Sequence, residues 1–102
     1  MKRVEVLVRA FQLAELTLAL RAIAISGATA TELWDARSEP AGGSVPIVKL
    51  EVVVHDDLVA RVMAAIRSAA SGFRAGGLLV LVEPVVAATG LPYGEIDEAA
   101  IA

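Results

Sequence analysis

The 102-residue chain contains no cysteine, one histidine and only 4% aromatic residues. Without cysteine it can form no disulfide framework, thiolate nucleophile or cysteine-type zinc site, and this composition fits a cytosolic protein. A single histidine excludes a multi-histidine metal site within one subunit. Because aromatic residues are so few, the chain also has no platform on which nucleic-acid bases could stack.

Positive charge and long apolar runs are scarce as well. The net charge is −3, and no run of lysine and arginine exceeds two residues. The chain therefore lacks the electrostatic footprint of a protein that binds nucleic acid or an anionic membrane. The longest purely aliphatic run, residues 78–82, is far shorter than the roughly 20 residues that span a bilayer. We expect a cytoplasmic protein with no nucleic-acid partner and no direct membrane insertion.

Apolar residues, in contrast, are in excess. They make up 57% of the chain, against roughly 45–50% in a typical globular domain. A single small subunit would leave some of this apolar surface uncovered, whereas the length suffices for one core. The composition therefore predicts one domain over residues 1–102 that associates with copies of itself.

One sequence pattern occurs twice. Residues 4–9 (VEVLVR) and residues 50–55 (LEVVVH) have the alternating apolar positions of a half-buried strand. Each is followed by apolar residues at helical spacing, from Leu13 in the first unit and from Val59 in the second. Gly27 and Gly72 are predicted to end the two helices, and Asp56 or the following aspartate to cap the second.

Two further strands complete the order of elements. Residues 28–34 are rich in β-prone threonine and leucine, and residues 78–82 form an aliphatic run followed by Glu83-Pro84, which is predicted to end it. The resulting order is βαββαβ. It predicts an α+β fold of the ferredoxin-like type, with a four-stranded antiparallel sheet and two helices on one face.

Two segments fall outside this pattern. Residues 35–46 contain two prolines and two adjacent glycines and show no hydrophobic period, so they form a loop of about a dozen residues. Hairpin loops usually have about two to five residues, and a loop this long is functional or disordered. Residues 89–102 carry glycine and proline and then an acidic, alanine-rich end. We expect this tail to be a flexible extension or a strap over a neighbouring subunit.

Three segments resemble the PII signal-transduction proteins: residues 9–13 (RAFQL), 27–33 (GATATEL) and 48–59 (VKLEVVVHDDLV). The likeness extends from Met1 to about Val86. The third segment is the most specific, because a strand pattern, an Asp-Asp turn and a helix start coincide in order. The resemblance implies a cytoplasmic homotrimer that binds an adenine nucleotide in the clefts between subunits. It also implies that the loop between the second and third strands, the T-loop, docks on a target protein.

The chain departs from this family in three places. Residues 35–46 stand where the T-loop belongs but are much shorter and contain no tyrosine, which argues against regulation by uridylylation. The Gly-Asp-Gly-Lys turn of the family aligns with residues 75–78 (AGGL), and its paired arginines fall at Ala87 and Ala88. Contacts to the outer phosphates are therefore missing. We expect AMP or ADP to be preferred to ATP, in a divergent protein similar to members linked to bicarbonate uptake or carboxysomes.

The residues expected to bind the nucleotide combine the resemblance with side-chain chemistry. A threonine hydroxyl can meet an adenine or ribose edge, a glycine-rich turn can form a nest of amides for phosphate, and two cations beside the long loop can hold phosphate or bicarbonate. These candidates are Thr29, Arg37, Lys49, Arg74, Gly76 and Gly77. The plain alternatives are a strand former, solvated surface cations and a helix-to-strand connection. The partner-binding loop would use Asp35, Ser38, Gly42 and Gly43.

Two other functions use the same scaffold. A CutA-like trimer would bind a divalent metal, although one histidine per chain would require ligands pooled around a threefold axis. Resemblance to an acylphosphatase-like hydrolase would require a glycine-rich loop with arginine directly after the first strand, whereas residues 8–11 (VRAF) contain no glycine. The chain also offers no Ser-His-Asp or Cys-His set for covalent catalysis. We therefore expect a non-enzymatic protein with no catalytic residue, metal or resident cofactor. His55 is interpreted as a strand end and helix cap.

Overall fold

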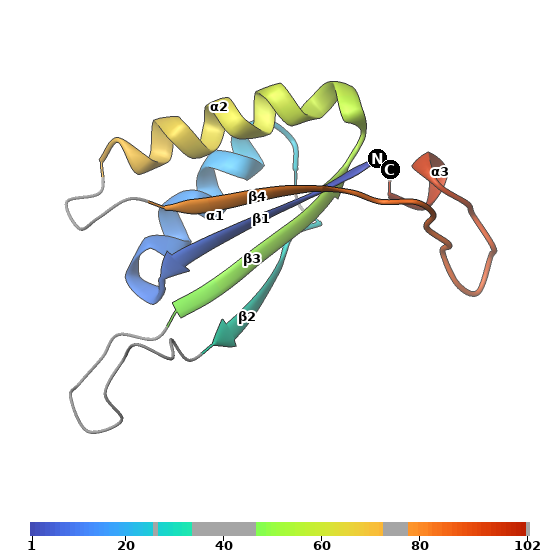
Figure 1. Ribbon diagram of the computed structural model, residues 1–102, viewed down its shortest axis with the longest axis horizontal. Helices are drawn as coiled ribbons and strands as arrows, with labels where there is room; N and C mark the ends of the chain where they lie inside the picture. The colour runs from blue at the N-terminus through green and yellow to red at the C-terminus, as the bar shows by residue number, and fades with distance from the viewer. Residues whose placement is uncertain (26, 34–46, 73–77, 102) are drawn as a thin grey trace.

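The computed structural model describes residues 1–25, 27–33, 47–72 and 78–101. Within these residues, four strands form one antiparallel sheet in the order β2-β3-β1-β4. The strands are β1 (Lys2–Arg9), β2 (Thr29–Leu33), β3 (Ile47–Val54) and β4 (Leu79–Pro84), shown in Figure 1. Helix α1 (Leu13–Ala22) follows β1, and α2 (Val59–Ala70) follows β3. The predicted α+β, ferredoxin-like architecture is confirmed.

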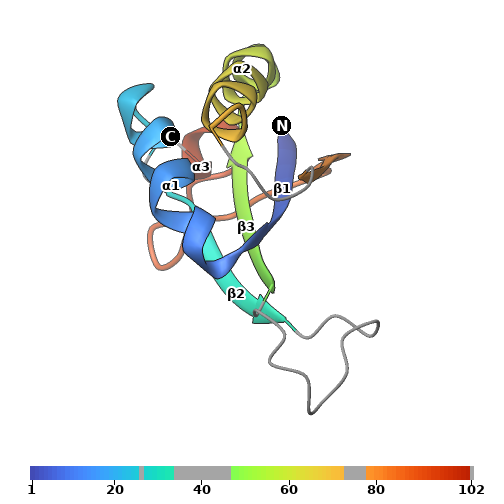
Figure 2. The same cartoon turned by 90° about the vertical axis from the view of Figure 1, so that its left-hand side faces the viewer.

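Strand alternation places one face of the sheet against both helices, as Figure 2 shows. The even-numbered residues of the two central strands are buried, from Val4 to Val8 in β1 and from Val48 to Val54 in β3. They pack against Leu16 and Leu20 of α1 and against Val62 and Ile66 of α2. Burying apolar area at about 25 cal/mol per Å² is the main stabilising contribution of this layer.

The odd-numbered residues point to the opposite face, which the two helices leave uncovered. This open face of the sheet carries Leu7 of β1 and Leu79 and Leu81 of β4, and the two β4 leucines are exposed. It also carries a cluster of charged side chains: Arg3, Glu5, Lys49, Glu51 and Glu83.

Three local predictions were wrong. Helix α1 ends at Ala22, before Gly27, because Ala24 adopts the left-handed conformation (φ 64°) and Ile25 N donates to Leu20 O. Neither aspartate caps α2 with its side chain: the helix begins after a 3₁₀ turn at Asp56–Leu58, and the Asp56 carboxylate binds the Met1 amino group at 2.8 Å. Strand β4 includes Pro84, which an edge strand tolerates.

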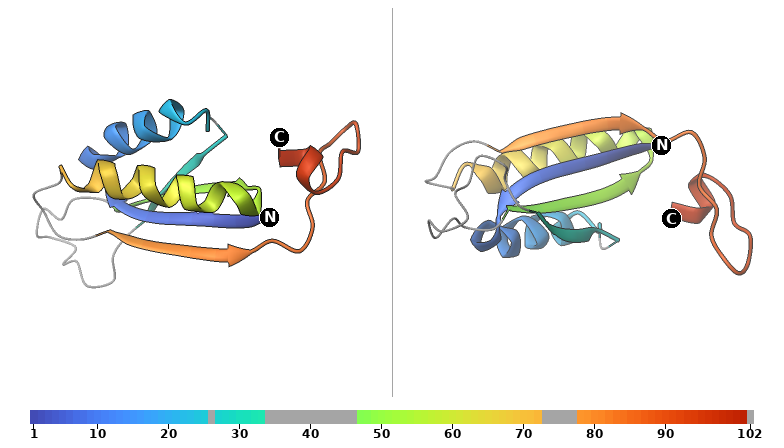
Figure 3. Two further views of the ribbon diagram at one scale, coloured as in Figure 1. Left: turned by 90° about the horizontal axis from the view of Figure 1, so that it is seen from above. Right: turned by 60° about the horizontal axis from the view of Figure 1, so that its bottom comes forward.

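The segment after β4 is ordered and crosses the end of the sheet. Val85 N donates to Met1 O, which extends the pairing of β4 with β1. Residues 88–97 then form a hairpin joined by a bridge between Thr89 and Ile96, and α3 (Glu98–Ile101) follows. Figure 3 shows this segment standing beyond the end of the sheet, with the two chain termini on the same side of the molecule.

Candidate functional site

A cavity lies where β3 runs past the start of β2. Thr29, the first residue of β2, pairs with Glu51, whereas β3 continues to Val54. The last three residues of β3 therefore have no partner in β2 and form the floor of a cavity of about 790 Å³. Its walls come from the segment between α1 and β2, from the turn before α2 and from α3. The lining residues are Arg3, Ala24, Ile25, Gly27, Thr29, Glu51, Val52, Val53, Val54, His55, Leu58, Ala100 and Ile101.

The cavity combines apolar walls with polar groups. Ile25, Leu58 and Ile101 contribute aliphatic walls, and Thr29 and Glu51 face each other across the β2–β3 pair. Small-molecule sites typically combine such an apolar lining with a small number of placed donors and acceptors. The arrangement can hold a flat, largely apolar group whose edge carries hydrogen-bonding atoms.

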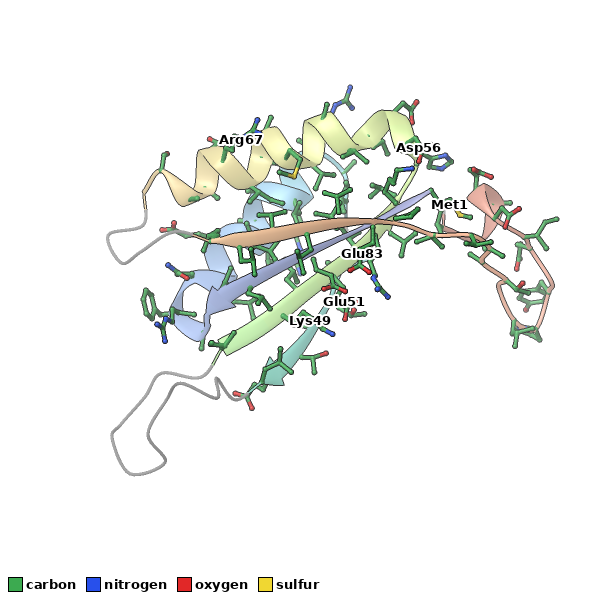
Figure 4. All side chains as sticks on the ribbon, in the orientation of Figure 1. Met1, Lys49, Glu51, Asp56, Arg67 and Glu83 are labelled. Atoms are coloured by element: carbon green, nitrogen blue, oxygen red, sulfur yellow. The ribbon has the colours of Figure 1, made fainter. Side chains whose placement is uncertain are left out.

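Glu51 is held in place by two cations. Its Oε1 atom lies 3.3 Å from Lys49 Nζ and its Oε2 atom 3.8 Å from Arg3 Nε. Figure 4 shows Lys49, Glu51 and Glu83 close together on the sheet. The carboxylate is less than one quarter exposed, so it keeps a defined orientation at the edge of the cavity.

Arg3 connects the cavity to the centre of the open face. Its Nη2 donates to Glu83 Oε2 at 2.9 Å, and its Nε lies 3.1 Å from Glu5 Oε1 without the alignment of a hydrogen bond. The hydrogen bond to Glu83, followed by the charge of that carboxylate, raises the pKa of Arg3 above its ordinary value. Arg3 therefore stays charged and is already engaged by three carboxylates.

Other kinds of site find less support in the described residues. In that part of the chain, no group of three or more histidine, cysteine, aspartate or glutamate side chains is placed to hold a metal ion. No helix among the described residues is long and apolar enough to cross a bilayer. The cavity is thus the feature to compare with known proteins.

The family model described as Nitrogen regulatory protein P-II matches residues 1–86. Nitrogen regulatory protein P-II of Bradyrhizobium diazoefficiens is 33% identical, covering 93% of this chain and 95% of the relative. The protein of the same name from Azospirillum brasilense is 34% identical with the same coverage, and that of Cereibacter sphaeroides is 31% identical over 99% of this chain and 100% of the relative.

The chain belongs to the P-II family. Membership makes it a signal-transduction regulator and not an enzyme. The predicted resemblance is confirmed, and so is the prediction that the chain carries no catalytic activity. The family match is with P-II proteins, so the CutA-like and hydrolase alternatives are not carried further.

Of the residues predicted for a P-II nucleotide site, the structure describes two, Thr29 and Lys49. Thr29 lines the cavity. Lys49 does not line it but lies beside it on the open face, paired with Glu51. The remaining candidates fall outside the described residues: Arg37, Arg74, Gly76 and Gly77, together with Asp35, Ser38, Gly42 and Gly43 of the loop.

Several lining residues were not predicted as site residues. Glu51 and Val53 were interpreted only as strand positions, and Ala100 and Ile101 as part of the tail. The register of β2 against β3 is what makes Glu51 a site residue, since it sets Glu51 opposite Thr29. His55 also lines the cavity; its carbonyl accepts from Leu58 N at 3.0 Å, which confirms its position at the strand end without a side-chain cap.

Proposed function

We propose that this P-II chain senses an adenine nucleotide, with AMP or ADP preferred to ATP and bicarbonate as a second small ligand. The nucleotide would bind at clefts between the subunits of a homotrimer, and a protein target would recognise the resulting conformation. The observation that carries the proposal is the cavity at the end of β3 that has no partner in β2, with Thr29 and Glu51 opposite each other at its edge.

The chemistry of the cavity suits the base of the nucleotide. Adenine has flat apolar faces and an edge that carries an amino donor and ring-nitrogen acceptors. Ile25 and Leu58 can cover the faces, the Glu51 carboxylate can accept from the amino group, and the Thr29 hydroxyl can donate to a ring nitrogen or ribose oxygen. The fixed orientation of Glu51 lowers the entropic cost of binding.

The proposed preference for AMP or ADP follows from the small number of cations available to the phosphates. Arg3 is the arginine among the described residues that line the cavity, and it already pairs with Glu5, Glu51 and Glu83. Phosphates would therefore rely on Arg37, Arg74 and the glycine turn, which has no lysine. With few cations to hold a triphosphate, the mono- and diphosphate are the better ligands. Lys49 and Arg37 are the proposed bicarbonate contacts.

The trimer is proposed from the open face of the sheet. Leu79 and Leu81 are exposed there, next to charged side chains that are already paired with one another. Packing three open faces around an axis would cover the leucines, and the cavity at the sheet edge would then border a neighbouring subunit. Residues 35–46 would supply the surface that docks on the target, through Asp35, Ser38, Gly42 and Gly43. Ligand contacts available to one loop conformer alone would shift the population toward it.

Isothermal titration calorimetry with AMP, ADP and ATP tests this proposal. We expect Thr29→Val to weaken ADP binding by about 2- to 10-fold, since one hydrogen bond is lost. Thr31→Val is the matched control, because Thr31 lies on the same face of β2 but pairs with Lys49 and does not line the cavity. Absence of binding by all three nucleotides at millimolar concentration would refute the proposal.

A further inference from the structure

Two carboxylates lie opposite each other on the two central strands of the sheet. Glu5 of β1 is the direct cross-strand partner of Glu51 of β3, and both side chains lie on the open face. The side chain of Glu5 is 11% exposed and that of Glu51 is 23% exposed. The β-carbons of such partners lie about 4.5–5.5 Å apart, and like charges at this spacing repel each other. A cation between the two carboxylates is needed to keep Glu51 in place.

Arg3 supplies this cation, although it is the cross-strand partner of neither carboxylate. It precedes Glu5 by two residues on the same face of β1, and its partner in β3 is Val53. Its Nε atom lies 3.1 Å from Glu5 Oε1 and 3.8 Å from Glu51 Oε2. This atom is buried, and in the described part of the chain no acceptor takes its hydrogen bond. A donor without a partner therefore faces both carboxylates.

Glu83 fixes the other side of the Arg3 guanidinium. Glu83 is the direct partner of Arg3 across β4 and β1, and its Oε2 atom accepts from Arg3 Nη2 at 2.9 Å. A planar guanidinium that is bound on one side holds its remaining N–H groups in set directions. Lys49 differs, because its amino group is a point charge on a flexible stem and does not line the cavity. Arg3 itself lines the cavity, so it holds Glu51 at the edge where a ligand would lie.

We propose that Arg3 is a positioning residue for base selection. It neutralises the repulsion from Glu5 and so keeps the Glu51 carboxylate directed at the edge of the bound base. An ionised carboxylate only accepts hydrogen bonds, so it suits the 6-amino group of adenine and opposes the 6-oxo group of hypoxanthine. The inference rests on the proposed adenine-nucleotide function. It assigns selection against 6-oxopurine nucleotides to Arg3, which acts through Glu51.

Calorimetry with ADP and inosine diphosphate tests this selection, because inosine diphosphate carries an oxygen in place of the 6-amino group. The wild type should bind ADP about tenfold or more tightly, since the other ligand sets an acceptor against an acceptor. Arg3→Met should reduce this ratio to about threefold or less. Lys2→Met is the matched control, because it removes a cation from β1 that pairs with Asp56 and does not line the cavity. It should keep the wild-type ratio. Any loss common to both nucleotides, such as weaker subunit assembly, cancels in the ratio.

Adding Glu5→Gln to Arg3→Met should restore most of the ratio, because the amide no longer repels Glu51. A crystal structure of ligand-free Arg3→Met should show the Glu51 carboxylate displaced away from Glu5. With ADP still bound, an unchanged ratio in Arg3→Met would overturn the role of Arg3, and so would failure of Glu5→Gln to restore the ratio or a Glu51 that has not moved. A wild type that binds neither nucleotide would refute the proposed function, and base selection with it.

Discussion

The guanidinium of Arg3 in β1 donates a 2.9 Å hydrogen bond from Nη2 to Oε2 of Glu83 in β4. The same side chain separates Glu5 from Glu51, which are direct cross-strand partners in β1 and β3. Like charges at such positions destabilise a sheet unless a cation lies between them. Arg3 thus joins three strands on a face that the helices do not cover.

Replacing Arg3 with methionine should therefore destabilise the protein through repulsion between Glu5 and Glu51. Salt screens this repulsion, so the free energy of unfolding should fall more at low ionic strength than at high ionic strength. Urea unfolding of the variant and the wild type at two salt concentrations measures this difference. In a Glu5→Gln background the same substitution should lower the free energy of unfolding by less. Equal losses of this free energy in both backgrounds would contradict the account.

The ion pair of Asp56 makes the stability of the protein depend on pH. Hydrogen bonds from the Met1 amino group and from Lys2 lower its pKa below the ordinary value of 3.8. Its contribution to stability is present above the unfolded pKa and is lost as pH falls through the lower, folded pKa. The stability difference between the wild type and Asp56→Asn should be constant between about pH 5 and pH 7, shrink below pH 5 and shrink at high salt.

Asp57→Asn is the matched control for this experiment, because it removes a carboxylate from the same 3₁₀ turn. It should leave the pH dependence of unfolding as in the wild type. An equal change in both variants would show that the pairing of Asp56 with the Met1 amino group is not the cause.

The core prediction compares two leucines of α1. Leu16 is fully buried against the sheet, whereas Leu18 is exposed on the other side of the helix. Leu16→Ala should lower the free energy of unfolding by about 2–5 kcal/mol, since it leaves a cavity in a packed layer. Leu18→Ala should change it by less than about 0.5 kcal/mol. Similar losses in urea unfolding would mean that the helix is packed differently.

A charged substitution on the open face of the sheet tests the proposed trimer. Leu81→Glu places a carboxylate near Glu5 and Glu83 on the face proposed to meet neighbouring subunits. Sedimentation equilibrium should show a trimer for the wild type and for Leu18→Glu, and a protomer for Leu81→Glu. A wild type that sediments as a stable protomer would remove the subunit clefts from the proposal.

The strands and long helices were predictable because their burial follows the sequence period. Alternation in residues 48–54 matches the alternating burial of β3, and the spacing of Val62 and Ile66 matches the buried side of α2. The ends of the individual helices and strands were less predictable. The Asp56 carboxylate binds the Met1 amino group, which is distant in sequence and precedes β1, and Pro84 is accepted because β4 lies at the edge of the sheet.

The lining of the cavity was predictable only in part. Thr29 was predicted as a nucleotide-binding residue through the family resemblance, and it lines the cavity. Glu51 became a candidate only through the register of β2 against β3, which depends on where β2 begins and leaves no local signal in the sequence. The contribution of Ala100 and Ile101 to the cavity depends on the path of residues 88–97. From composition alone, this segment was predicted to be a flexible extension or a strap.

The most direct measurement of the sensor proposal is a crystal structure of the protein with ADP. The account predicts the adenine ring in the cavity at the end of β3 that has no partner in β2, with its amino group within hydrogen-bonding distance of Glu51 and an edge against Thr29. ADP bound elsewhere on the protein, or a cavity that remains empty at saturating ADP, would contradict it.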